Sequence, residues 1–239
     1  MKVALPVAAV FAGLFFGCAQ VRAPQGGPKD TTPPQLVSSS PEQGSVRFSG
    51  QRIVLHFDES IKLDQVRQRL LISPPLAAQP DVAVSRATDV TITLKAPLKD
   101  NTTYSFNLGG CVMDLSEGNR VNDLAFVIST GDHIDSLAIH GDVTEANTGL
   151  PAPDMLVLLH TVDDTGDVRT ALPDYFTRTD AAGNFKLTHL RSGHYHINAL
   201  LDKNTNYRFD LPNEEVAFLD RTVEPSDSTA MHLLLFRPA

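Results

Sequence analysis

An oxygen-rich segment in the last sixth of the chain is the strongest candidate for chemistry. Asp202, Asn204, Asn206 and Asp210 match the first, third, fifth and ninth positions of a calcium loop of the D-x-N-x-N type, and Glu214 follows them. Oxygen side chains at alternate positions of a loop can converge on one hard cation. The pattern therefore makes calcium the candidate ion, with these five side chains as its ligands.

Two departures from the loop pattern favour another interpretation. Tyr207 stands where the pattern has glycine, and Asn213 stands where it has a carboxylate, one residue before Glu214. The alternative is a solvated turn in which Asn side chains hydrogen-bond to their own backbone. That turn needs no ion, so the sequence requires no cofactor, and calcium stays an alternative.

Two further clusters resemble metal sites less closely. Asp114, Glu117 and Asn119 could contact a cation, but a tight turn explains the same residues better. His194 and His196 alternate along a predicted strand and project to one side of it. Structural zinc needs four ligands and catalytic zinc needs three, so we expect histidines at a strand surface and no zinc site.

The motifs of the common enzyme classes are missing from the sequence. It contains no G-x-S-x-G elbow, no H-E-x-x-H helix, no P-loop and no dinucleotide fingerprint. Cys111 follows an apolar strand pattern and is expected to be a buried free thiol. The net charge of −8 and the scattered Lys and Arg argue against a nucleic-acid partner. We expect no enzyme activity.

The amino terminus has the pattern of an export signal. Lys2 precedes the uncharged apolar run from Val3 to Phe16, which is too short for a permanent membrane span. The run ends at Gly17-Cys18, which resembles a bacterial lipobox, where the cysteine is acylated before cleavage. We predict a lipoprotein signal peptide over residues 1–17 and lipidation at Cys18, which makes the membrane a partner through the lipid anchor.

The segment after the lipidation site is rich in Pro and Gly. Residues 18–34 cannot form a helix or a central strand, and we predict a flexible tether. No Asp follows Cys18, a feature that by resemblance to known lipoproteins favours the outer membrane of the cell envelope. The sequence leaves open whether the protein faces the periplasm or the cell surface.

The rest of the chain consists of short apolar runs that alternate with turn residues. Sixteen prolines, fifteen glycines and no tryptophan suit many short strands. Strands are predicted at 35–39, 52–57, 70–73, 82–85, 90–94, 103–108, 126–129, 137–143, 155–160, 175–178, 184–187, 194–200 and 232–236, with one short helix within 63–71. A polar segment at 130–136 divides them. The predicted fold is all-β, with two β-sandwich domains in series at 35–132 and 133–239.

The first of these domains resembles a known family. The motifs are Thr32-Pro33-Pro34, Ser40-Pro41-Glu42-Gln43-Gly44, Leu98 through Tyr104 and Phe126 through Gly131. In this order and spacing they look like the S-layer (SbsA)-type bacterial Ig-like domain over about residues 32 to 132. The resemblance implies an Ig-like sandwich with a structural or adhesive role.

The second domain resembles a different family. Its motifs are Ile139 through Val143, Met155 through Leu159, the turn Asp180 through Gly183, and Leu190 through Tyr195. They look like the carboxypeptidase-regulatory, transthyretin-like sandwich that also occurs as B-type repeats of surface proteins. Related repeats bind calcium, which by resemblance supports the candidate ion.

The whole arrangement resembles that of lipoproteins of Bacteroidetes. It predicts a membrane-anchored cell-envelope lipoprotein that is a non-catalytic structural, adhesive or binding module for an unidentified envelope protein or glycan. Two alternatives stay open: a calcium-stabilised adhesion or assembly module, and an accessory domain of an envelope peptidase or glycan-processing enzyme. The sequence names no ligand.

Overall fold

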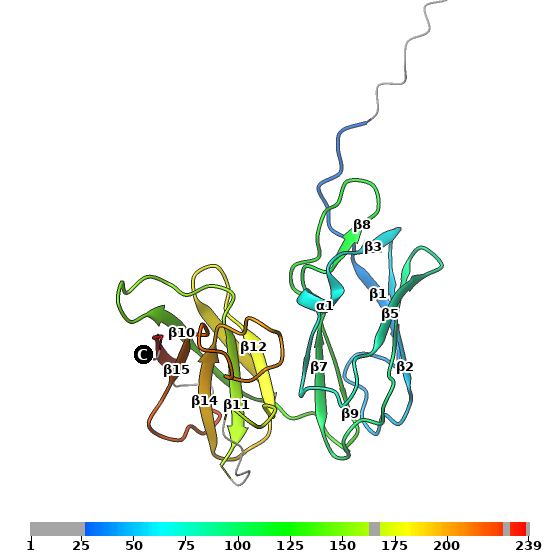
Figure 1. Cartoon of the computed structure of the whole chain (residues 1–239). Coiled ribbons are helices and arrows are strands. Elements are labelled where there is room, and N and C mark those ends of the chain that lie inside the picture. The colour runs from blue at the N-terminus through cyan, green and yellow to red at the C-terminus, as the bar shows by residue number, and fades with distance from the viewer. Residues whose placement is uncertain (1–26, 163–167, 227–229, 238–239) are drawn as a thin grey trace, which may run out of the picture. The chain divides into compact units, whose positions relative to one another are not determined.

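The regular secondary structure of the described residues is almost entirely β-strand (Figure 1). The computed structural model describes residues 27–162, 168–226 and 230–237. Within these ranges the helical structure consists of one turn, α1 (Val66–Arg69), and sixteen strands form five sheets. The all-β fold predicted from the sequence is confirmed.

The predicted signal peptide and Cys18 lie outside the described residues. Residues 1–30 separate from Thr31–Ala239 by their contacts, and the description below concerns the second unit. None of the helices in the described part of the chain is long and apolar enough to cross a membrane.

The first nine strands form two larger sheets and one short ribbon. One sheet has the order β1 (Leu36–Ser40), β2 (Arg52–Phe57), β6 (Asp89–Thr93), β5 (Asp81–Ser85). The other has the order β4 (Leu71–Ser73), β7 (Thr103–Asn107), β9 (Ala125–Ser129). The ribbon pairs β3 (Ile61–Leu63) with β8 (Val112–Asp114). All of these ladders are antiparallel.

The two larger sheets enclose a core that follows the period of the strands. Ile53, Leu55 and Phe57 alternate along β2 and are fully buried, while His56 between them is exposed. Tyr104, Phe106, Phe126 and Ile128 of the opposite sheet complete the same cluster. Because successive strand residues point to opposite faces, this alternation places the apolar side chains of both sheets in one interior.

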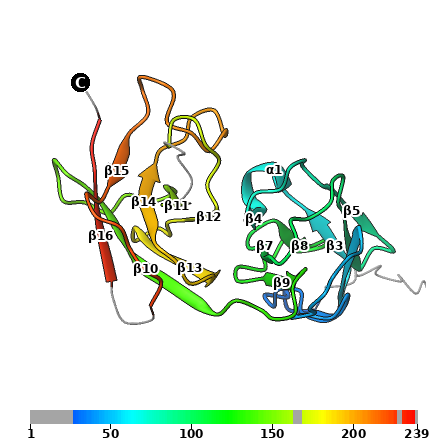
Figure 2. The ribbon, with the colours of Figure 1, turned by 90° about the horizontal axis from the view of Figure 1, so that it is seen from below.

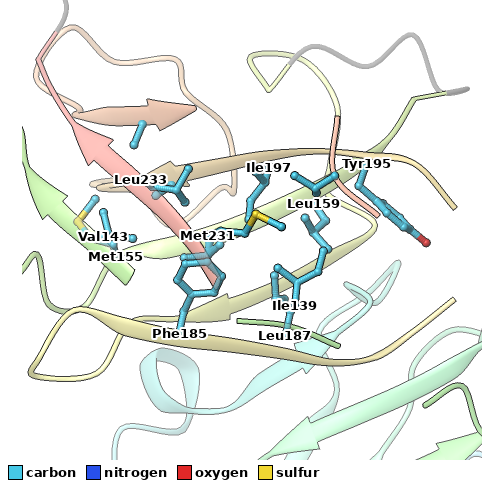
Figure 3. Close-up of a cluster of buried hydrophobic side chains, with 14 of the residues drawn as sticks. Ile139, Val143, Met155, Leu159, Phe185, Leu187, Tyr195, Ile197, Met231 and Leu233 are labelled. Atoms are coloured by element: carbon cyan, nitrogen blue, oxygen red, sulfur yellow. The ribbon is translucent and has the colours of Figure 1, made fainter. Parts of the chain in front are cut away.

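The remaining strands form a second pair of sheets (Figure 2). One sheet has the order β13 (Asn184–Leu190), β10 (Leu137–Glu145), β16 (Ala230–Leu235). The other has the order β12 (Tyr175–Arg178), β11 (Leu156–Thr161), β14 (Tyr195–Leu200), β15 (Val216–Phe218). Their inner faces meet in a second core, in which Ile139, Phe185, Leu159, Ile197 and Met231 lie against one another (Figure 3).

Strand β11 is buried on both of its faces. Val157 and Leu159 belong to the core between the sheets, whereas Leu156 and Leu158 belong to a smaller cluster on the other face. That cluster includes Tyr207 and Phe209 from the connection between β14 and β15. This connection therefore covers the outer face of the sheet, and it contains the candidate calcium loop.

The sequence located most strands and missed the shortest ones. Each predicted strand overlaps an observed strand, but β3, β8 and β15 were not predicted. They have three residues each, which is too few to show alternation. The helix predicted within 63–71 shrinks to the four residues of α1, because β3 ends at Leu63 and β4 begins at Leu71.

The end of the predicted tether contacts the first sandwich. Pro34 is buried, the Thr32 carbonyl accepts a hydrogen bond from Asn119 Nδ2 at 3.4 Å, and Gln35 N donates to Asp58 Oδ1 at 2.8 Å. The chain is thus held to the sandwich from Thr32 onward. The boundaries of the predicted domains stay a prediction.

β16 lies beside β10, the first strand of the second sandwich. β16 pairs with β10 in parallel, from His140 with Ala230 to Glu145 with Leu235. At the pair of Gly141 and Met231 the two backbones approach so closely that a Cβ on Gly141 would lie 2.0 Å from the Met231 carbonyl oxygen. The neighbouring atoms are backbone, so no side-chain movement can make room.

Replacing Gly141 with Ala should therefore destabilise the protein. We expect Gly141→Ala to lower the free energy of unfolding by about 3 kcal/mol, the upper part of the range for overpacking. Gly27→Ala, where a Cβ meets nothing within 4 Å, is the matched control. Urea denaturation of both variants measures the difference, and equal stabilities would contradict the close approach.

Candidate functional site

The candidate calcium loop lies in the connection from β14 to β15. Asp202 follows the end of β14 at Leu200, and Glu214 lies two residues before the start of β15 at Val216. The structure brings all five predicted ligands into one hydrogen-bonded loop, with contacts from Asp202 to Asn206, from Asn204 and Asn206 to Asp210, and from Asp210 to Glu214. The question is whether their oxygens are available to an ion.

Asp202 organises the first half of the loop. Its carboxylate accepts the backbone N–H of Asn206 at 3.3 Å and of Tyr207 at 2.8 Å. Tyr207 has φ +62°, the left-handed conformation that the calcium-loop pattern assigns to glycine. A tyrosine in this region is strained, by roughly 1–2 kcal/mol. Position 207 thus keeps the backbone conformation of the calcium-loop pattern, although its residue is tyrosine and not glycine.

Packing offsets the strain at Tyr207. Its ring lies 4.8 Å from the ring of Phe176, centroid to centroid, at an angle of 55°. Leu156, Leu158 and Leu200 lie in the same apolar cluster. This burial raises the pKa of Tyr207 above its ordinary value. The tyrosine therefore fixes the loop to the outer face of the sheet.

The two asparagines turn their amide groups toward Asp210. Asn204 Nδ2 donates to Asp210 Oδ1 at 3.0 Å, and Asn206 Nδ2 donates to Asp210 Oδ2 at 2.7 Å. Asn206 Oδ1 accepts the N–H of Arg208 at 2.8 Å. Both Asp210 oxygens thus accept side-chain hydrogen bonds from within the loop, and the bond between Arg208 and Asn206 is of the side chain-to-backbone kind that the alternative turn predicts.

Glu214 anchors the loop from inside. Its side chain is fully buried. Glu214 Oε1 accepts the N–H of Lys203 at 3.1 Å, and Oε2 accepts the N–H groups of Asp210 and Leu211, each at 3.0 Å. One carboxylate thereby ties both ends of the loop together. Sequence analysis named Glu214 only as a metal ligand and did not anticipate this role.

The arrangement does not form a cation cage. In residues 27–162, 168–226 and 230–237, no three His, Cys, Asp or Glu side chains are grouped so that they could hold a metal ion. The carboxylates of Asp202, Asp210 and Glu214 instead accept N–H groups. As placed, these oxygens bond to the loop itself, and calcium binding stays a prediction.

The other acidic segment is also a capped turn. Asp114 is buried, and its carboxylate accepts the N–H groups of Gly118 and Asn119 at 2.9 and 2.8 Å and that of Glu117. Burial acts to raise the pKa of Asp114, but these backbone hydrogen bonds outweigh it, and the pKa lies below the ordinary 3.8. Asp114 therefore stabilises the turn as an anion.

The remaining candidates have structural surroundings. His194 Nδ1 lies 3.1 Å from Glu224 Oε1 in an exposed pair. Cys111 is fully buried, its Sγ donates to the Leu108 carbonyl at 3.1 Å, and burial raises the pKa of its thiol to about 11. A protonated, enclosed thiol is a poor nucleophile.

Two histidine–carboxylate pairs were missed from the sequence. His56 Nδ1 lies 2.6 Å from Asp89 Oδ1, and His232 Nδ1 lies 2.6 Å from Asp142 Oδ2. Each pair joins neighbouring strands, β2 with β6 and β10 with β16. The partners are 33 and 90 residues apart, so only knowledge of the strand pairing could have found them.

The geometry of Glu214 generates a stability prediction. Glu214→Gln places an N–H₂ group against backbone N–H donors in a buried site, so the free energy of unfolding should fall by about 1–3 kcal/mol. Glu117→Gln, at an exposed carboxylate, should change it little. Urea denaturation measures both. The candidate ion has its own test. A wild-type melting temperature that is higher in calcium than in chelator supports calcium binding, and equal values support a loop held by its own hydrogen bonds.

The lowered pKa of Asp114 generates a pH prediction. A carboxylate with a lowered folded-state pKa stabilises the protein above its unfolded pKa, and this contribution is lost as the pH falls through the folded value. Asp114→Asn should thus be less stable than wild type near neutral pH, and the gap should close below pH 3.8. Urea titrations across this range test it, with exposed Asp123→Asn as control. A gap that does not change with pH would contradict the assignment.

Comparisons with known proteins assign one part of the chain. Residues 30–130 match a protein family described as bacterial Ig-like domain. This range holds β1–β9, and the Ig-like character predicted there from the sequence is confirmed. The match covers less than half of the chain and leaves the second sandwich unassigned. A search of curated proteins finds no match.

Solved structures show only distant likeness. The N-terminal part of the bacterial S-layer protein SbsC is 16% identical over 85% of this chain and 43% of that chain, with a TM-score of 0.28. BcpA, the major pilin subunit of Bacillus cereus, is 10% identical over 86% of this chain and 71% of the pilin chain, with a TM-score of 0.29. An L,D-transpeptidase from Mycobacterium smegmatis is 12% identical over 70% of this chain and 76% of the transpeptidase chain, with a TM-score of 0.30. The chain thus covers less than half of the S-layer chain. TM-scores this low do not establish a shared fold.

Proposed function

We propose that this protein is an exported lipoprotein of the bacterial cell envelope that acts as a non-catalytic structural or adhesive module. The observation that carries the proposal is the match of residues 30–130 to bacterial Ig-like domains. It follows the predicted signal peptide over residues 1–17, the predicted lipidation site Cys18 and the predicted tether. The family match supports an envelope module, and the sequence pattern at Cys18 adds the lipid anchor.

The physics of acyl chains supports a lasting anchor. Each buried CH₂ group contributes about 0.8 kcal/mol, so the several chains of a lipidated cysteine hold a folded domain at a bilayer far longer than one chain would. The absence of Asp after Cys18 favours the outer membrane. Bacteroidetes is the proposed source, on the resemblance of the domain order alone.

The roles of the reactive side chains support a non-catalytic module. Asp114 and Glu214 are buried carboxylates that accept backbone hydrogen bonds, and the Cys111 thiol is enclosed and protonated. Each of these groups stabilises the fold where it lies. The partners of such a module are an envelope protein or a glycan, which we propose contact the strand connections of the sandwiches, where binding residues concentrate.

Intact-mass spectrometry of the protein from the membrane fraction of its host tests this function. We expect a mature species that begins at Cys18 and carries the added mass of acyl chains. Cys18→Ala should lose that mass and leave the membrane fraction, because it removes the acylated sulfur.

Cys111→Ser is the matched control, since it removes the other cysteine of the chain and should keep the acyl mass. A soluble mature form that is cut elsewhere and is the same in wild type and Cys18→Ala would refute the lipoprotein proposal. A secreted protein with two sandwiches would then remain.

A further inference from the structure

A hollow of about 370 Å³ opens at one end of the second sandwich. It is lined by the end of β10 and the turn after it, the residue before β15, and the end of β16, namely by Glu145, Asn147, Glu215, Leu235, Phe236 and Arg237. Its volume lies in the range of small-molecule sites in proteins. It is separate from the candidate calcium loop.

Strand pairing holds the walls of the hollow in place. Glu145 is in register with Leu235 in the parallel ladder of β10 and β16. Val216 and Phe236 exchange two backbone hydrogen bonds of 2.9 and 3.0 Å, which join the start of β15 to the end of β16. The lining side chains therefore project from fixed backbone, and the site is preformed.

Leu235 and Phe236 form the apolar part of the lining, and the ring of Phe218 contacts that of Phe236 from outside the lining. Phe236 is 37% exposed and Phe218 is 53% exposed, whereas phenylalanine side chains are most often buried in a core. Their ring centroids lie 5.6 Å apart at 73°, an edge-to-face contact that fixes the ring of Phe236. Solvent-exposed aromatic rings rimmed by polar groups are typical of binding sites.

The rim carries the groups that recognise hydroxyls. Glu145 accepts a hydrogen bond from Thr148 Oγ1 at 2.8 Å, and Glu215 pairs with Arg237 at 2.9 Å. The exposed amide of Asn147 offers both a donor and an acceptor. Two carboxylates against one guanidinium leave the hollow with one net negative charge, which repels anionic ligands.

We propose that this hollow binds a neutral sugar unit of a cell-envelope glycan. The ring of Phe236 packs against the apolar C–H face of the sugar, and Glu145, Asn147 and the Glu215–Arg237 pair hydrogen-bond to its hydroxyl groups. A stable protein interface needs about 800 Å² on each partner, which a hollow of this size does not offer. The inference deepens the proposed envelope function and rests on it, since that function places the sandwich in the cell envelope, where glycans are available.

Binding of neutral oligosaccharides to the purified full chain tests the proposal. Ligand-observed NMR and calorimetry would compare linear oligomers of glucose and of N-acetylglucosamine with an anionic oligogalacturonate. We expect a neutral oligomer to saturate a single site and the anionic one to bind more weakly. Phe236→Ala and Glu145→Gln should each weaken the neutral ligand about tenfold, because each removes one kind of contact.

Leu115→Ala, at an exposed apolar residue of the first sandwich, is the matched control and should bind as wild type does. If Phe236→Ala unfolds, Asn147→Ala, at an exposed residue of the same lining, gives the same readout. Failure of every neutral oligomer to bind, or equal binding by wild type and all hollow variants, would overturn the proposal. The acylation of Cys18 is measured separately, so either hypothesis can fail alone.

Discussion

The second sandwich depends on the parallel pairing of β16 with β10. β16 contributes Met231, Leu233 and Leu235 to the core, and it completes the sheet whose other members are β10 and β13. A parallel pair requires a long connection, and here it closes only when the end of the chain returns beside the start of the domain. Gly141 makes room for that return.

Buried carboxylates hold loop backbone that has no place in a sheet ladder. Asp114 and Glu214 each accept three N–H groups from backbone that lies outside the strands. An unpaired backbone group costs free energy when it is buried, and a charge-assisted hydrogen bond is among the strongest ways to satisfy it. The same solution occurs in both sandwiches, so long connections stay ordered beside very short strands.

The sequence predicted the parts of the fold that depend on local pattern. The alternation of residue types along 52–57 and 90–94 puts Ile53, Leu55, Val90 and Ile92 on the apolar faces of their strands, and all four are buried. It could not predict β15, because three residues show no period, nor the pairing of β10 with β16, because nothing local encodes a partner 90 residues away. The pairs His232–Asp142 and Val216–Phe236 depend on that register and were out of reach for the same reason.

The candidate loop shows why spacing alone cannot assign a cation. Several carboxylates close together must be compensated, and either an ion or a set of N–H groups can do so. In a calcium loop the last carboxylate faces the ion, whereas here Asn213 holds that position and Glu214, one residue later, points into the protein. That shift of one residue takes one ligand away from a possible ion and gives the backbone an anchor. Oxygen spacing along the chain is the same for both solutions, and the direction of Glu214 separates them.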